Sequence, residues 1–167
     1  MGLSEANNEV GGRAWRRPAQ SSAGYSMLQI VVAFAVVAVL VTIAFPTTMN
    51  SLRNYRLTAA LAAATGAISA TRFQAIMHAY PYNITFNSSN ATYQVASEPP
   101  GATSFTNVGT AVPLSGVGDV TVSPTTTLQF NANGTVSATT GTLSFTISNP
   151  VMTHTITVTG VGDVSSN

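Results

Sequence analysis

The sequence has no cysteine, no lysine and few charged residues of any kind. Without cysteine, neither a disulfide framework nor thiolate chemistry can support the fold or an activity. Only 7% of the residues are charged, whereas typical soluble domains have roughly 25%. Half of the arginines lie in the first 17 residues, and no arginine follows Arg72. This distribution argues against nucleic acid as a partner, because phosphate binding needs basic side chains.

Groups that could carry catalysis are also scarce. The histidines, and the acidic residues outside the first 24 positions, are His78, His154, Glu98, Asp119 and Asp163. No Ser/His/acid arrangement and no pair of histidines at metal-ligand spacing occurs among them. We therefore predict a structural protein that is not an enzyme and that binds no cofactor or metal. His78 falls near the end of a predicted helix, where positive charge is favourable, and His154 is expected to be a partly buried strand residue.

A long apolar run is the most prominent feature that is present. From Met27 to Phe45 the only clearly polar residues are Gln29 and Thr42. At about 1.5 Å per residue the run spans roughly 28 Å, which is close to the hydrocarbon thickness of a bilayer. Arginines precede it, so the segment before it is expected in the cytoplasm and the rest outside. A cleaved secretory signal would have a shorter apolar core and a small-x-small site, so the run is expected to be retained.

The pattern after the apolar run predicts that the helix continues. Ala is abundant, and larger apolar residues recur at helical spacing. The face predicted from this spacing contains Leu52, Leu57, Leu61, Ile68, Ala75 and Ile76. Pro46 lies at the junction, where it should kink the helix or end its membrane part. We expect one helix from about Tyr25 to about His78, apolar all round in its first half and amphipathic in its second.

After Tyr80 the pattern changes to short alternating runs between Gly, Pro, Asn and Ser. In the segment GTLSFTIS, the apolar residues Leu143, Phe145 and Ile147 alternate with polar ones, which is typical of a strand. Asn133-Gly134 is a hairpin signal. GVGDV occurs at 116–120 and again at 160–164, which suggests a repeated turn followed by a strand, with each aspartate bonding local amides. The predicted fold is α+β, with a long N-terminal helix packed on a C-terminal antiparallel β-sheet or β-sandwich.

The start of the apolar run resembles that of type IV pilins and type II secretion pseudopilins. Gly24 is followed by the aromatic Tyr25, and Pro46 is the twenty-second residue counted from Tyr25. The resemblance implies that a prepilin peptidase cleaves after Gly24 and that Tyr25 is methylated. The domains expected on this basis are a cytoplasmic leader at 1–24, a transmembrane assembly helix at 25–46, an amphipathic half-helix at 47–80 and a periplasmic β domain at 81–167.

Three further segments resemble the minor subfamily that includes the pseudopilin H subunit and the FimT-like pilins. They are Thr71-Arg72-Phe73-Gln74-Ala75-Ile76, the hairpin with Leu128-Gln129-Phe130 and Asn133-Gly134-Thr135, and the closing strand from His154 to Gly162. Residues 81–125 match no pattern of that subfamily. Some FimT-like pilins are implicated in DNA uptake, but this chain has no arginine or lysine after Arg72.

Gln29 departs from the family, which usually has glutamate at the fifth mature position. In the family that carboxylate is thought to offset the positive N-terminus of the neighbouring subunit during assembly in lipid. An amide can accept a hydrogen bond from an ammonium but cannot neutralise it. Three interpretations remain open: a subunit at or near the filament tip, assembly through a weaker contact, or a tolerated polar residue near the membrane interface.

These observations together predict a minor pilin or pseudopilin subunit of the bacterial inner membrane. The expected partners are other pilin or pseudopilin subunits, prepilin peptidase and the inner membrane itself. One alternative is a monomeric, membrane-anchored β domain that binds a ligand, and another is the major pilin of a filament. The sequence leaves open whether the machine is a secretion system, a pilus or an uptake apparatus.

Overall fold

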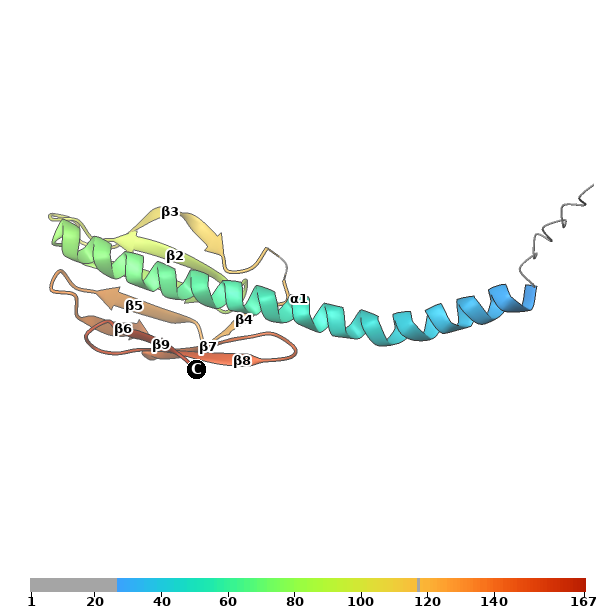
Figure 1. The fold of residues 1–167 in the computed structure, drawn as a ribbon. Coiled ribbons are helices and arrows are strands. Elements are labelled where there is room, and N and C mark those ends of the chain that lie inside the picture. The colour runs from blue at the N-terminus through green and yellow to red at the C-terminus, as the bar shows by residue number, and fades with distance from the viewer. Residues whose placement is uncertain (1–26, 117) are drawn as a thin grey trace, which may run out of the picture. The chain divides into compact units, whose positions relative to one another are not determined.

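The structure is a computed structural model that describes residues 27–116 and 118–167 (Figure 1). Within these ranges one helix, α1 (Met27–His78), precedes all of the strands. The strands are β1 (Tyr82–Asn87), β2 (Thr92–Ser97), β3 (Thr106–Pro113), β4 (Thr121–Ser123), β5 (Thr126–Phe130), β6 (Val136–Thr140), β7 (Ser144–Ser148), β8 (Thr153–Val158) and β9 (Val164–Ser166). The predicted α+β architecture is confirmed. The expected leader, with Gly24 and Tyr25, lies outside the described residues.

The chain divides into two compact units, residues 1–40 and 41–167. The described part of the first unit is the beginning of α1. The second unit holds the rest of α1 and all of the described strands, so the helix–sheet packing lies within it.

The strands form two antiparallel sheets. One has the order β3-β2-β1-β5-β6 and the other has the order β4-β7-β8-β9. The predicted hairpin at Asn133-Gly134 is confirmed, because this turn joins the antiparallel strands β5 and β6. Gly134 has a φ of 81°, a conformation that glycine adopts without the steric cost of a side chain. The turn closes with a hydrogen bond of 2.9 Å from the Gly134 N–H to the Asn131 carbonyl.

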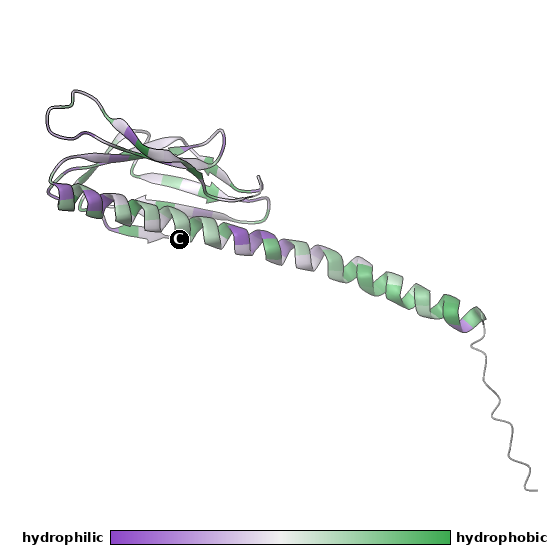
Figure 2. Cartoon of the chain, turned by 90° about the horizontal axis from the view of Figure 1, so that it is seen from above, coloured by the Kyte–Doolittle hydropathy of each residue, from purple (hydrophilic) through white to green (hydrophobic). Residues whose placement is uncertain are grey.

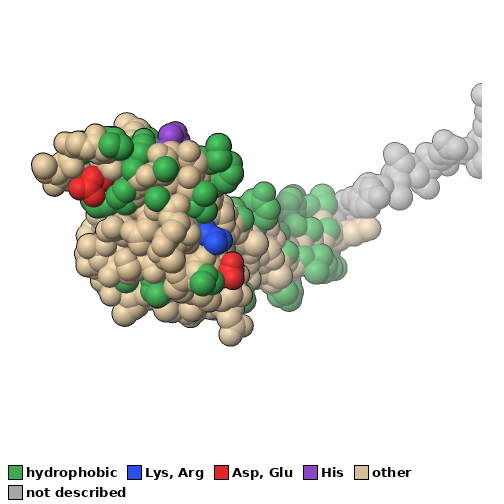
Figure 3. Space-filling view, turned by 90° about the vertical axis from the view of Figure 1, so that its left-hand side faces the viewer, with side chains coloured by type: hydrophobic (Ala, Val, Ile, Leu, Met, Phe, Trp, Pro, Cys, Tyr) green, Lys and Arg blue, Asp and Glu red, His purple; other side chains and the backbone are tan. Residues whose placement is uncertain are grey.

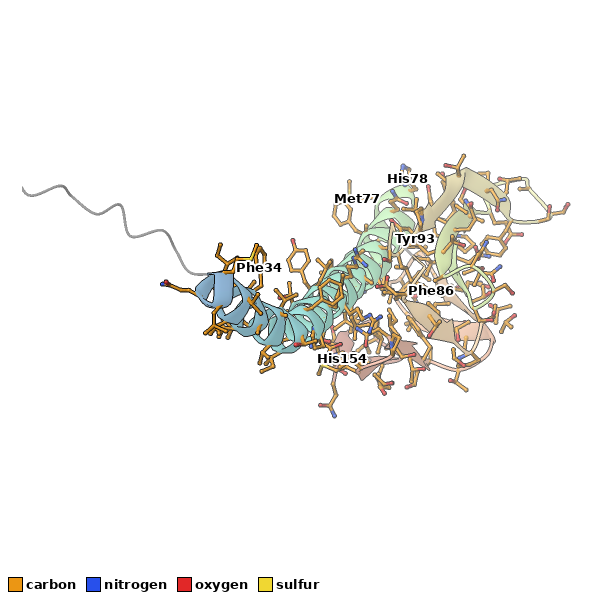
Figure 4. The ribbon with its side chains drawn as sticks, turned by 90° about the vertical axis from the view of Figure 1, so that its right-hand side faces the viewer. Phe34, Met77, His78, Phe86, Tyr93 and His154 are labelled. Atoms are coloured by element: carbon orange, nitrogen blue, oxygen red, sulfur yellow. The ribbon has the colours of Figure 1, made fainter. Side chains whose placement is uncertain are left out.

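The core lies where alternate residues of the two sheets meet one face of α1. Phe86 of β1 stacks on Phe145 of β7 with ring centroids 4.6 Å apart, so the two sheets share one core. In β7 the side chains of Phe145 and Ile147 are buried and those of their neighbours are only partly so, which confirms the predicted alternation. Figure 4 labels Phe86 and Tyr93, whose rings also contact one another at 6.1 Å.

The face of α1 that packs on the sheets differs from the predicted face. Its buried residues are Leu57, Ala60, Ala64, Ile68, Thr71 and Ala75, spaced three or four apart. Three predicted members are among them, and Leu61 packs at the edge of the core. Leu52 and Ile76 are 43% and 46% exposed, so the prediction was wrong for these two.

Candidate assembly surface

The apolar run is helical and fully exposed. Every residue of α1 from Met27 to Phe45 is exposed, although almost all of these side chains are apolar. Figure 2 shows this part of α1 in the green of hydrophobic residues, and Figure 4 labels Phe34 as one of its projecting side chains. By length and composition α1 can cross a membrane. Valine is abundant here but is a modest helix former in water, whereas in lipid the cost of unpaired backbone groups favours a helix.

Gln29 lies at the edge of a shallow hollow on the apolar segment. The hollow has a volume of about 250 Å³ and is lined by Gln29, Ile30, Ala33, Phe34 and Val37. The short side chain of Ala33 creates it, because the flanking side chains extend much further from the helix. Such a hollow can receive a side chain of another apolar helix. Gln29 would then be the polar group nearest to that contact.

A second hollow of the same kind lies further along the apolar segment. It has a volume of about 340 Å³ and is lined by Val32, Ala35, Val36, Val39 and Leu40. Ala35 takes the place that Ala33 has in the first hollow. Small alanines among larger apolar side chains give the segment an uneven surface, which suits packing between helices rather than a small-molecule site.

The helix continues through Pro46, which lacks a backbone N–H. Three hydroxyl groups around it donate hydrogen bonds to carbonyls one turn back. They are Thr47 Oγ1 to the Ile43 carbonyl at 3.3 Å, Thr48 Oγ1 to Ala44 at 3.0 Å and Ser51 Oγ to Thr47 at 3.1 Å. These bonds satisfy the hydroxyl donors within the helix itself. These three hydroxyl groups therefore do not depend on water for a hydrogen-bond acceptor.

Arg56 ties α1 to the β domain where their contact begins. Its Nη1 atom donates to Asp119 Oδ2 at 2.9 Å, and both side chains are partly buried. The carboxylate precedes β4, at the end of the first GVGDV copy. On the same part of α1, the side-chain amide of Asn149 donates to the Arg53 carbonyl at 2.9 Å. Two loops of the β domain thus hold one turn of the helix.

Arg72 ties the other end of α1 to the second GVGDV copy, whose last residue begins β9. Its Nη1 atom lies 3.5 Å from the Gly162 carbonyl and 3.8 Å from Asp163 Oδ1. Its side chain also lies beside Gly134, at the tip of the β5–β6 hairpin. The segment 71–76, the hairpin and the closing turn, which carry the subfamily resemblance, therefore meet around one guanidinium. Figure 3 views this end of the β domain, where few charged side chains appear.

The two GVGDV copies confirm the prediction of a turn followed by a strand, but not the expected role of their aspartates. Asp119 and Asp163 each form an ion pair with an arginine of α1 instead of bonding local amides with their carboxylates. Of the three arginines on α1, Arg56 and Arg72 pair with the aspartates of the two GVGDV copies, and Arg53 does not.

An aromatic cluster marks the C-terminal end of α1. His78 lies in the last turn, as predicted, and its ring contacts those of Tyr80 and Tyr82 at centroid distances of 5.5 and 5.7 Å. The two tyrosine rings stack at 5.2 Å, with their hydroxyl oxygens 3.2 Å apart. Burial, followed by the hydrogen bond with Tyr80 and repulsion from its charge, raises the pKa of Tyr82 to about 12, and a hydrogen bond with Ser97 opposes this shift. His154 is partly buried in β8, as predicted.

In the described ranges, residues 27–116 and 118–167, no three His, Asp or Glu side chains form a group that could hold a metal ion. Comparisons with curated proteins and with solved structures find no match. The family model for type II transport protein GspH matches residues 60–162, more than half of the chain. The match includes residues 81–125, which resemble no pattern of the pilin subfamily named above. It also includes Arg72 and the two turns around it. The chain therefore belongs to the family of type II transport protein GspH.

Proposed function

We propose that the chain is a pseudopilin subunit that builds a filament of a type II secretion system and has no catalytic activity. Membership of the GspH family supports this role. The observation that carries the proposal is the exposure of the whole apolar run from Met27 to Phe45. A surface of this extent must be covered by lipid or by other apolar helices, because contiguous exposed apolar patches of soluble monomers are much smaller.

The proposed mechanism begins in the inner membrane. Prepilin peptidase cleaves after Gly24, and the new N-terminal residue Tyr25 is methylated. Residues 25–46 then hold the subunit in the bilayer as a single span, while residues 47–80 and the β domain at 81–167 lie in the periplasm. The positive charges before the run support this orientation.

Assembly transfers the apolar segment from lipid into a filament. There it packs against the same segment of other subunits in head-to-tail contacts that do not close into a ring. Packing between side chains, rather than escape from water, is the driving force while the helices remain in lipid. The hollows at Ala33 and Ala35 can receive side chains of a neighbouring helix in that packing.

In this proposal Gln29 is the polar side chain of the assembly contact. Its amide oxygen accepts a hydrogen bond from the N-terminal ammonium of a neighbouring subunit but leaves the charge in place. A subunit with such a weak contact is best suited to the tip or to a position near the tip, where it is a minor component. The buried face of α1 and the ion pair of Arg56 with Asp119 hold the β domain on the helix, so that the domain selects the neighbours.

The absence of cysteine gives a direct test of assembly. An Ala33→Cys variant, produced with the other subunits of its secretion system that carry single cysteines in their apolar segments, should form disulfide-linked pairs on oxidation. The same strain without prepilin peptidase is the control and should give none. Ser137→Cys, on an exposed position of β6, controls for disulfides that form by random collision and should give few linked pairs. If Ala33→Cys forms no pairs in the complete strain, the monomeric membrane-anchored β domain becomes the better interpretation, and pairs mainly between copies of this chain would indicate a major pilin.

A further inference from the structure

A hollow of about 610 Å³ lies between α1 and two loops of the β domain, just beyond the apolar run. Its apolar lining comes from Met49, Leu52 and Pro150, and its charged lining from Arg53, Arg56 and Asp119. Met49 and Leu52 are large exposed hydrophobic residues that neither the core nor the apolar run accounts for.

The hollow carries one positive charge that is not matched. Arg56 is paired with Asp119 at 2.9 Å. Arg53 is exposed, and in the described part of the chain it forms no ion pair, whereas Arg56 and Arg72 do. The hydrogen bond from Asn149 to the Arg53 carbonyl fixes this turn of the helix. The turn that carries Arg53 is therefore fixed beside an apolar surface, and its guanidinium has no anionic partner among the described residues.

The position of Arg53 along α1 places its side chain within reach of the headgroup layer of the membrane. Arg53 follows Phe45, the last residue of the apolar run, by eight residues, or about 12 Å of helix axis at 1.5 Å per residue. The polar headgroup layer outside the hydrocarbon is about 5–8 Å thick on each side of a bilayer. A long arginine side chain can extend back along the helix over this remaining distance.

We infer that the hollow binds the headgroup phosphate of an anionic phospholipid in the outer leaflet of the inner membrane. The guanidinium of Arg53 donates hydrogen bonds to the phosphate oxygens, a pairing for which its planar fork is suited. Met49 and Leu52 contact the apolar part of the lipid next to the headgroup. This inference rests on the proposed membrane anchoring, and it adds a site that positions the β domain at the bilayer surface before assembly.

The test uses the full chain in vesicles of phosphatidylcholine that contain a small fraction of phosphatidylglycerol with a photoactivatable headgroup. After illumination, mass spectrometry maps the labelled segments. The wild type should be labelled between Met49 and Arg56. Arg53→Gln should lower that labelling about fivefold, the usual effect of one basic residue near an anionic surface. Labelling near Arg13, Arg16 and Arg17 should be unchanged, which makes it an internal reference.

Asn50→Gln is the matched control, because Asn50 is exposed on the same turn but does not line the hollow. Equal labelling of residues 49–56 in the wild type and in Arg53→Gln would overturn the inference. The inference would also be overturned if inorganic phosphate abolished the labelling of residues 49–56 while sodium chloride of equal ionic strength did not. The site would then bind free phosphate. If the chain instead fails to cosediment with any vesicles, the proposed anchoring itself fails, and this outcome is distinguishable from failure of the lipid site.

Discussion

Arg72 lies so close to Gly162 that a methyl group added at this glycine would be 2.7 Å from the Arg72 Nε atom and 2.8 Å from its Cδ atom. Gly162 also has a φ of 84°, which disfavours any other residue. The helix and the closing turn therefore fit against one another closely at this point, although the two residues are 90 positions apart in the sequence.

Gly162→Ala should lower the free energy of unfolding by about 2 kcal/mol, because the alanine must both adopt a left-handed conformation and displace Arg72. Chemical denaturation of the full chain in detergent, followed by far-UV circular dichroism, measures this change. Gly160→Ala is the control, since a methyl group there meets nothing within 4 Å and no positive φ is involved. An equal effect of both substitutions would show that Arg72 does not determine the fit.

The two ion pairs should differ in their contribution to stability. Asp119→Asn should cost about 1–3 kcal/mol, because Arg56 then loses a charge-assisted hydrogen bond at a partly buried position. Asp163→Asn should change the free energy of unfolding by less than about 0.5 kcal/mol, since Asp163 is 76% exposed and its pair with Arg72 is 3.8 Å long. Chemical denaturation of both variants at low and high salt measures the two losses in the free energy of unfolding. Equal losses would contradict the predicted difference.

Tyr82 should make the stability fall at high pH. Its pKa is raised from 10.0 to about 12 in the folded protein, so the folded state holds the proton over a range in which the unfolded state releases it. The stabilisation is complete below pH 10 and is lost progressively as the pH rises towards 12, by about 2–3 kcal/mol in total. Tyr82→Phe should remove this part of the pH dependence. If wild type and variant lose stability in parallel between pH 10 and 12, the assignment to Tyr82 is wrong.

Gln29 offers a test of the proposed assembly contact. Gln29→Glu should raise the amount of this subunit in isolated filaments severalfold, because a carboxylate can neutralise the neighbouring ammonium. Gln29→Leu should lower it, since the ammonium then loses its hydrogen-bond acceptor. Quantitative mass spectrometry of filaments, with the total membrane content as reference, measures the ratio. Equal incorporation of all three forms would indicate that Gln29 is only a tolerated polar residue.

Local patterns predicted the elements of the fold but not their partners. The alternation in GTLSFTIS and the turn Asn133-Gly134 depend on neighbouring residues, and both predictions were confirmed. The pairing of β1 with β5, and the separation of β4 and β7 into a second sheet, depend on packing between distant segments. Period-two patterning specifies which face is buried, but it does not specify which strand lies alongside.

The pattern of α1 likewise predicted its buried face only in part. Helical spacing placed Leu57, Ile68 and Ala75 on the buried face, but it also included Leu52 and Ile76, which remain exposed. Periodicity does not say where contact with the β domain begins, and in the structure the buried face starts at Leu57. The positions of Arg56 and Arg72 opposite the two acidic turns were likewise hidden, because ion pairing across 63 and 91 positions leaves no local pattern.

In the proposed function, this chain becomes an assembled pseudopilin only after cleavage at Gly24. The most direct measurement is the intact mass of the protein extracted from membranes of a host with active prepilin peptidase, compared with a Gly24→Ala variant. The account predicts a mass that begins at Tyr25 and includes one added methyl group, and it predicts the full-length mass for the variant. A full-length mass for both proteins would contradict it and would favour a membrane-anchored domain that keeps its leader.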